Sequence, residues 1–153
     1  MDNEFTWVNA ASAILAKAGI ADCDAKELSP LTLAYIGDCV YELVVRTIVV
    51  GTAERTVNTM HKHTCRYVNA AAQRTILESV AEQLTEQEQS VVRRGRNAKS
   101  HSVAKNASVS DYRYATGFEA LCGYWYLTGQ NDRMLTLITE AMKAFDGEDK
   151  SGN

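Results

Sequence analysis

The sequence has little proline, no closely paired cysteines and no excess of positive charge. Proline occurs once in 153 residues, so the residue that most often interrupts long helices is nearly absent. The four cysteines are scattered without a C-x-x-C pair, which argues against zinc ribbons and redox dithiols and favours reduced thiols. A formal net charge of −3 gives by itself no sign of a nucleic-acid partner.

Signals for targeting and for membrane insertion are also missing. No N-terminal stretch combines a basic segment with an apolar one, so we expect no secretion signal and a cytoplasmic protein. The apolar run over residues 31–50 is long enough for a membrane span, but it contains Asp38, Glu42 and Arg46, which favour a core helix and no membrane contact. We expect one domain over residues 1–146 and a disordered polar tail over residues 147–153.

Apolar periodicity and capping signals predict an all-α fold. Ser29 followed by Pro30, with Gly51 after the run, marks one long helix that should be enclosed on nearly all faces. Thr85 and Glu88 have the spacing of a capping box, which predicts a helix from residue 86. Together with these two, the expected helices span residues 5–18, 31–50, 57–67, 70–83, 86–96, 111–128 and 131–145.

Two acidic residues lie where the pattern otherwise predicts core. Asp38 follows Gly37 in the long helix, and Glu119 lies in the helix that Ser110 and Asp111 are expected to cap. Glycine inside a helix costs about 1 kcal/mol relative to alanine. The glycines at 37, 117 and 123 therefore favour a close approach of two helices that would bring Asp38 and Glu119 together.

A pair of carboxylates with room for water and phosphate suits magnesium. The alternative is a buried carboxylate that bonds to a tyrosine hydroxyl or pairs with arginine. Glu42 and Arg46 share a helix face with Asp38, and a glutamate four residues before an arginine is well placed for an ion pair. We expect Arg46 to neutralise Glu42; the other possibility is that Glu42 acts through a water on the metal.

These motifs resemble those of the ribonuclease III family. AYIGD at residues 34–38, followed by Val40 and Tyr41, is similar to the signature helix of ribonuclease III catalytic domains. TGFEAL at residues 116–121, followed by Gly123, is similar to their second acidic motif. The closer resemblance is to Mini-ribonuclease III, the subgroup without an appended double-stranded-RNA-binding domain. Its pattern fits residues 31–139, including RRGRNAKS at 93–100, Lys105-Asn106 and YRY at 112–114.

The resemblance implies an all-α, homodimeric helical bundle of the ribonuclease III catalytic-domain type. It implies cleavage of double-stranded RNA that depends on Mg²⁺, with Mn²⁺ as a substitute, in the maturation of 23S ribosomal RNA. Asp38 and Glu119 would be the catalytic metal ligands. A symmetric dimer would cut one strand at each of its two sites. The resemblance leaves open whether a ribosomal protein assists.

The chain departs from the wider family at three positions. A general ribonuclease III has acidic residues where this sequence has Leu31, Ala34 and Thr116. Because Asp38 and Glu119 alone remain, we expect one metal ion with several water ligands. The alternative is an inactive protein of the same fold that binds double-stranded RNA or the ribosome.

Positive charge is concentrated after the capping box. Six of the sixteen Lys and Arg residues lie between residues 93 and 113, and residues 97–110 lack apolar periodicity, which predicts a long loop. Composition alone leaves two interpretations open, a solvated helix end and a phosphate-binding segment; the resemblance favours RNA binding. The candidate RNA-binding residues are Arg93, Arg94, Arg96, Asn97, Lys99, Lys105 and Arg113.

Overall fold

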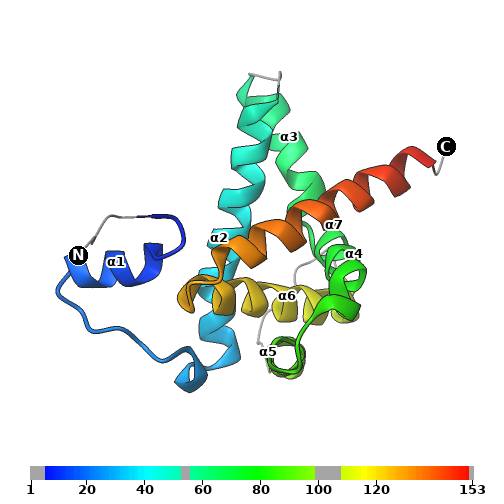
Figure 1. The fold of residues 1–153 in the computed structure, drawn as a ribbon. Coiled ribbons are helices and arrows are strands. Elements are labelled where there is room, and N and C mark those ends of the chain that lie inside the picture. Colours follow the sequence, from blue (N-terminus) through cyan, green and yellow to red (C-terminus); the bar gives the residue numbers. More distant parts are fainter. Residues whose placement is uncertain (1–5, 53–55, 99–107, 152–153) are drawn as a thin grey trace.

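The computed structural model describes residues 6–52, 56–98 and 108–151, and every regular element in these ranges is helical. This confirms the predicted all-α class. The elements in order are α1 (Ala10–Lys17), the 3₁₀ turn η1 (Ala25–Glu27), α2 (Pro30–Gly51), α3 (Val57–Val68), α4 (Ala70–Val80), the 3₁₀ turn η2 (Ala81–Gln83), α5 (Glu86–Asn97), α6 (Val109–Leu127) and α7 (Asn131–Ser151) (Figure 1).

The helix at the centre of the fold is α6. It packs most extensively against α2, then against α5 and α4 (Figure 1). Phe118, Leu121 and Trp125 of α6 are fully buried, and the ring of Phe118 makes an edge-to-face contact with Tyr41 of α2 at 4.9 Å between centroids. The neighbouring Tyr126 also belongs to the core.

Helix α2 is buried on one side only, which corrects the expectation that it is enclosed on nearly all faces. Gly37, Tyr41 and Val45 lie on its buried side. Tyr35 and Leu43 lie on the opposite side and are 83% and 52% exposed. The second apolar side of α2 therefore has no cover among the described residues of this chain.

Several helix ends follow the predicted caps. The Ser29 hydroxyl accepts a hydrogen bond from the Thr32 N–H at 3.1 Å, and the capping box of Thr85 and Glu88 forms in both directions. A glycine with positive φ follows α1 and α6, at Gly19 and Gly129.

Other boundaries differ from the prediction. Ser108, not Ser110, caps α6 by accepting from the Asp111 N–H at 3.0 Å, because Ser108 and Asp111 have the spacing of a helix cap. Helices α3 and α4 are separate, as their predicted ranges indicated, but α4 ends at Val80 and a 3₁₀ turn over Ala81–Gln83 follows it, where the prediction continued the helix to residue 83. Helix α7 continues through Gly147 to Ser151, which corrects the expected start of the tail, since Glu148 and Lys150 are good helix formers.

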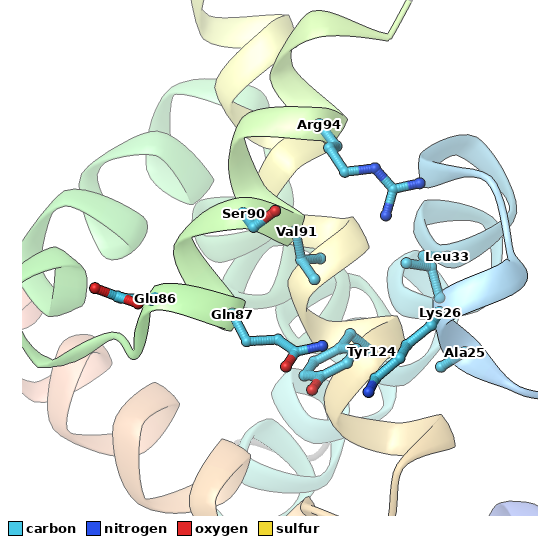
Figure 2. A pocket seen from close by; sticks show the side chains of 9 residues that line it. All are labelled: Ala25, Lys26, Leu33, Glu86, Gln87, Ser90, Val91, Arg94 and Tyr124. Carbon is cyan, nitrogen blue, oxygen red and sulfur yellow. The ribbon is translucent and has the colours of Figure 1, made fainter.

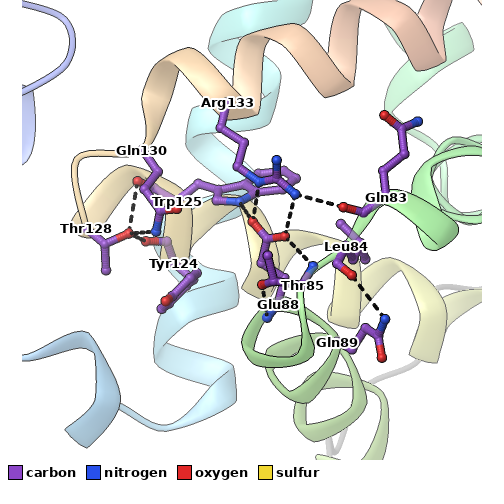
Figure 3. Close-up of polar contacts among 10 residues, drawn as sticks. All are labelled: Gln83, Leu84, Thr85, Glu88, Gln89, Tyr124, Trp125, Thr128, Gln130 and Arg133. Carbon is purple, nitrogen blue, oxygen red and sulfur yellow. Dashed lines mark hydrogen bonds and ion pairs between the residues drawn. The ribbon is translucent and has the colours of Figure 1, made fainter.

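A buried ion pair connects the helices at the end of α6 that is away from Ser108 (Figure 3). Glu88 of α5 accepts hydrogen bonds from the Trp125 indole at 2.6 Å and from two nitrogens of Arg133 at 2.7 and 2.8 Å. Burial would raise the pKa of Glu88, but the Arg133 guanidinium, the Thr85 N–H and the Trp125 indole lower it to about 2. The contact fixes α5 and α7 against α6. None of the described helices is long and apolar enough to cross a membrane.

Candidate active site

Glycines let the backbones of α2 and α6 touch. A Cβ added at Gly37 would lie 1.7 Å from the Glu119 carbonyl oxygen, and one added at Gly123 would lie 2.0 Å from the Leu33 carbonyl oxygen. No side chain fits at either position, so the close approach predicted from the sequence is confirmed. Gly117 corrects part of that prediction: it faces α5, where an added Cβ would lie 2.8 Å from the Val92 carbonyl oxygen.

This contact brings Asp38 and Glu119 into one open cleft of about 440 Å³. Glu119 is partly buried, whereas Asp38 is exposed at the surface, which corrects the expectation that Asp38 is buried. The other residues of the cleft are Leu31, Ala34, Tyr35, Ile36, Cys39, Tyr112 and Thr116. Cys39 is also exposed here.

The two carboxylates repel each other. Burial and then the charge of Asp38 raise the pKa of Glu119 to about 8, against a smaller opposing effect of a hydrogen bond with Gln73. Burial and then the charge of Glu42 raise the pKa of Asp38. Without a cation, the pair therefore keeps a proton at neutral pH. No described Lys or Arg forms an ion pair with either carboxylate, so the predicted alternative of an arginine partner is not seen in the described part of the chain.

Gln73 of α4 is a neighbour of the site that sequence reasoning missed. It is 2% exposed, its amide nitrogen donates to the Val68 carbonyl oxygen at 3.2 Å, and its side chain lies near enough to Glu119 to lower the pKa of that carboxyl. The Gln73 Oε1 atom is buried without a hydrogen-bond partner. The signal in the sequence was a glutamine within the apolar face that Ile76, Leu77 and Val80 continue.

The donor set fits a hard divalent cation. No group of three or more His, Cys, Asp or Glu residues suited to a metal occurs among the described residues. A cation at Asp38 and Glu119 would complete its coordination with water and phosphate oxygens, as Mg²⁺ does. Such an ion would relieve the repulsion between the two carboxylates. Glu42 pairs with Arg46 at 3.5 Å, as predicted; the Arg46 side chain is exposed and that of Glu42 is half-buried.

The predicted basic segment does not form one stripe. Arg94 and Arg96 lie about 200° apart around α5 by helical spacing. Arg94 lines a second cleft (Figure 2), whereas the Arg96 guanidinium stacks 4.1 Å from the centroid of the Tyr114 ring. Helix α6 separates Arg96 from the carboxylates, because Tyr114 and Gly117 lie on a different side of that helix from Glu119.

The remaining candidate RNA-binding residues are exposed or lie outside the described ranges. Arg93, Asn97 and Arg113 are exposed, and Arg113 follows Tyr112, which lines the carboxylate cleft. Lys99 and Lys105 lie outside the described residues.

Comparisons with known proteins agree with this architecture. The sequence profile of the Ribonuclease III domain matches residues 31–130, which include both carboxylates. The chain belongs to the ribonuclease III family. It is 51% identical over 114 residues to a Mini-ribonuclease 3 of Symbiobacterium thermophilum, a match that covers 74% of this chain and 88% of the relative. It is 43% identical over 133 residues to a Mini-ribonuclease 3 of Thermoanaerobacter, with 87% and 90% covered.

A solved structure agrees as well. A crystal structure of a protein from Fusobacterium nucleatum superimposes with a TM-score of 0.72 at 27% identity, covering 81% of this chain and 98% of that one. These relatives place the chain with the Mini-ribonuclease III proteins, as its motifs indicated. Membership of this ribonuclease III subgroup supports an endoribonuclease activity, the hydrolysis of phosphodiester bonds inside an RNA strand.

Proposed function

We propose that the protein is a Mg²⁺-dependent endoribonuclease that cleaves double-stranded RNA. The observation that carries the proposal is the meeting of Asp38 and Glu119 in one open cleft with no described cationic side chain to neutralise them. The family supplies the substrate class. Mg²⁺, or Mn²⁺ in its place, would polarise the scissile phosphate and activate the attacking water when bound.

The residues of the cleft have separate roles in this proposal. Asp38, exposed on α2, would be the principal metal ligand, and Glu119 on α6 would be the second ligand that fixes the position of the ion. Both must be deprotonated to bind it, so metal binding would release the proton that the pair holds at neutral pH. Gln73 on α4, which lowers the pKa of Glu119, would help to position the Glu119 side chain.

RNA would be held mainly through its phosphates. Arg93, Asn97 and Arg113 are exposed and free to contact a duplex, and Lys99 and Lys105 would add to this surface. Because A-form RNA is recognised through its phosphates, 2′-hydroxyls and shape, the sequence preference should be weak. Arg96 would support this surface indirectly, through its contact with Tyr114.

We also propose that the protein acts as a homodimer. Leu31 and Tyr35 line the carboxylate cleft and are exposed on the uncovered side of α2. A second copy placed over this side would bury them and provide one site for each RNA strand. Sedimentation should then give twice the mass of the chain, and Tyr35→Arg should give the single-chain mass.

Within the cell, the substrate we propose is precursor 23S ribosomal RNA in the cytoplasm, with or without a ribosomal protein. Incubation of the pure protein with long duplex RNA tests the proposal. Mg²⁺ should allow cleavage into products with 5′-phosphates, chelator should stop it, and single-stranded RNA of the same sequence should stay intact. Intact duplex in the presence of Mg²⁺ would overturn the proposal.

A second candidate is an inactive protein that only binds double-stranded RNA. Leu31, Ala34 and Thr116, which replace acidic residues of the wider family, all line the same cleft, so the site offers fewer metal ligands. This candidate predicts tight duplex binding at every Mg²⁺ concentration without any cut strand.

A further inference from the structure

A second cleft of about 440 Å³ lies between η1, α2, α5 and α6 (Figure 2). It shares no lining residue with the carboxylate cleft. Leu33 and Tyr124, which line it, each lie five residues from Asp38 and Glu119 along the same two helices. The second cleft therefore flanks the α2–α6 contact on a different side from the carboxylates.

The charged groups of this cleft are mainly cationic. Lys26 of η1 and Arg94 of α5 approach it from opposite walls (Figure 2). Neither forms an ion pair within the part of the chain that the structure describes. Glu86 also belongs to the lining, but its carboxylate is directed away from both cations in Figure 2. Two unneutralised cations facing one cavity favour an anion.

Neutral hydrogen-bonding groups also line the second cleft. The side chains of Gln87, Ser90 and Tyr124 line the same cleft as Lys26 (Figure 2). Each of these groups can donate to a phosphate oxygen. The apolar floor is formed by buried Leu33 and Val91, which would strengthen the electrostatic attraction above it.

We infer that this cleft binds a phosphate group between Lys26 and Arg94. Its volume lies within the range of about 300–1,000 Å³ typical of small-ligand sites, so a phosphate could enter with an attached ribose. The group can come from the RNA backbone or from a free phosphate compound. The RNA source rests on the proposed function; the affinity for phosphate does not. In the RNA case, the cleft would hold one phosphate of the duplex while a different phosphate lies at Asp38 and Glu119.

The first arm of the test measures inorganic phosphate binding by ¹H–¹⁵N NMR at constant ionic strength. The amide signals of Lys26, Ser90 and Arg94 should shift and saturate. Lys26→Gln and Arg94→Gln should each weaken binding about tenfold or more, since each removes a hydrogen bond between a charged donor and the phosphate. Lys26→Arg keeps the charge and should bind nearly as wild type. Lys143→Gln removes an exposed charge on α7 and should have no effect. Shifts that do not saturate, or variants equal to wild type, would overturn the inference.

The second arm identifies the source of the phosphate. Duplex RNA affinity is measured in chelator, so that no strand is cut, over a range of salt concentrations. If the cleft holds a backbone phosphate, the double variant Lys26→Gln/Arg94→Gln should bind about 3–10-fold more weakly and lower the slope of log K against log salt by about 1. An unchanged slope, combined with saturable phosphate binding, assigns the cleft to a free phosphate compound.

The two proposals can fail separately. A wild-type protein that cuts duplex RNA but shows no saturable phosphate binding would refute the inference and leave the nuclease intact. A wild-type protein that binds phosphate at Lys26 and Arg94 but never cuts RNA would refute the nuclease and leave the cleft intact.

Discussion

Replacing Glu119 with glutamine should change how stability depends on pH. The pKa of Glu119 is 4.5 without perturbation and about 8 in the folded protein, because of burial and the charge of Asp38. Between these values the folded protein holds a proton that the unfolded chain has released. The free energy of unfolding of the wild type therefore falls as the pH rises from about 4.5 to about 8. Glutamine has the same shape and no charge, so the variant lacks this decrease.

The size of the effect follows from the two pKa values. Each tenfold change in proton affinity is worth about 1.4 kcal/mol, so the full difference between 4.5 and 8 sets an upper limit of about 5 kcal/mol. Glu119 is only partly buried, and solvent screens part of the interaction. We expect about 2–3 kcal/mol.

Urea unfolding in chelator at pH 5 and pH 9 measures this difference. From pH 5 to pH 9, the free energy of unfolding of Glu119→Gln should rise by about 2–3 kcal/mol relative to that of wild type. Mg²⁺ at pH 9 should stabilise the wild type but not the variant. For Glu140→Gln, at an exposed position of α7, the free energy of unfolding relative to wild type should not change between these pH values. If the difference in free energy of unfolding between Glu119→Gln and wild type stays constant within about 0.5 kcal/mol from pH 5 to pH 9, the reasoning is refuted.

Three further predictions concern the surroundings of the site. Gly37→Ala should cost more than about 3 kcal/mol in urea unfolding, because its Cβ would meet the Glu119 carbonyl oxygen at 1.7 Å, whereas Gly51→Ala, with no atom within 4 Å, should change stability by less than about 1 kcal/mol; equal effects would contradict the close contact. Glu88→Gln should cost about 2–4 kcal/mol at pH 7, because it leaves Arg133 without its partner. That cost should shrink as the pH falls from 4.5 toward 2, where wild-type Glu88 also becomes protonated, and a cost that does not change with pH would rule out the lowered pKa. Gln73→Leu should raise the Mg²⁺ concentration for half-maximal cleavage about tenfold at unchanged Kd for duplex RNA; an unchanged Mg²⁺ requirement would show that the Gln73 contact does not position Glu119.

The main helices and the meeting of the two carboxylates could be predicted because each depends on local signals. The Thr85–Glu88 capping box forms between residues of a single helical turn, so the local sequence is enough to predict it. Gly37 and Gly123 are costly within a helix, so their presence indicated a backbone contact, and the contact forms. Asp38 lies next to one of these glycines, which placed it near the partner helix.

Features that depend on long-range packing could not be predicted in the same way. The Glu88–Arg133 pair joins residues 45 positions apart, and no local signal links them. Gln73 on α4 lies near Glu119 on α6, a neighbour 46 residues away in the sequence. Arg94 and Arg96 are close in sequence, but residues two apart in a helix lie on nearly opposite sides, so the two arginines of α5 lie on different surfaces. The sequence predicts that the exposed side of α2 is buried, because an apolar helix face without a partner has the same sequence pattern as a buried one.

The central claim is that Asp38 and Glu119 act together on one cation to cut RNA. The most direct measurement is the cleavage rate of an end-labelled duplex RNA at saturating Mg²⁺ for wild type, Asp38→Asn and Glu119→Gln, with Kd for the same duplex measured in chelator. Each variant should cut about a hundredfold more slowly or worse, with Kd changed by less than about threefold. If both variants cut within about tenfold of the wild-type rate, the two carboxylates are not the catalytic site.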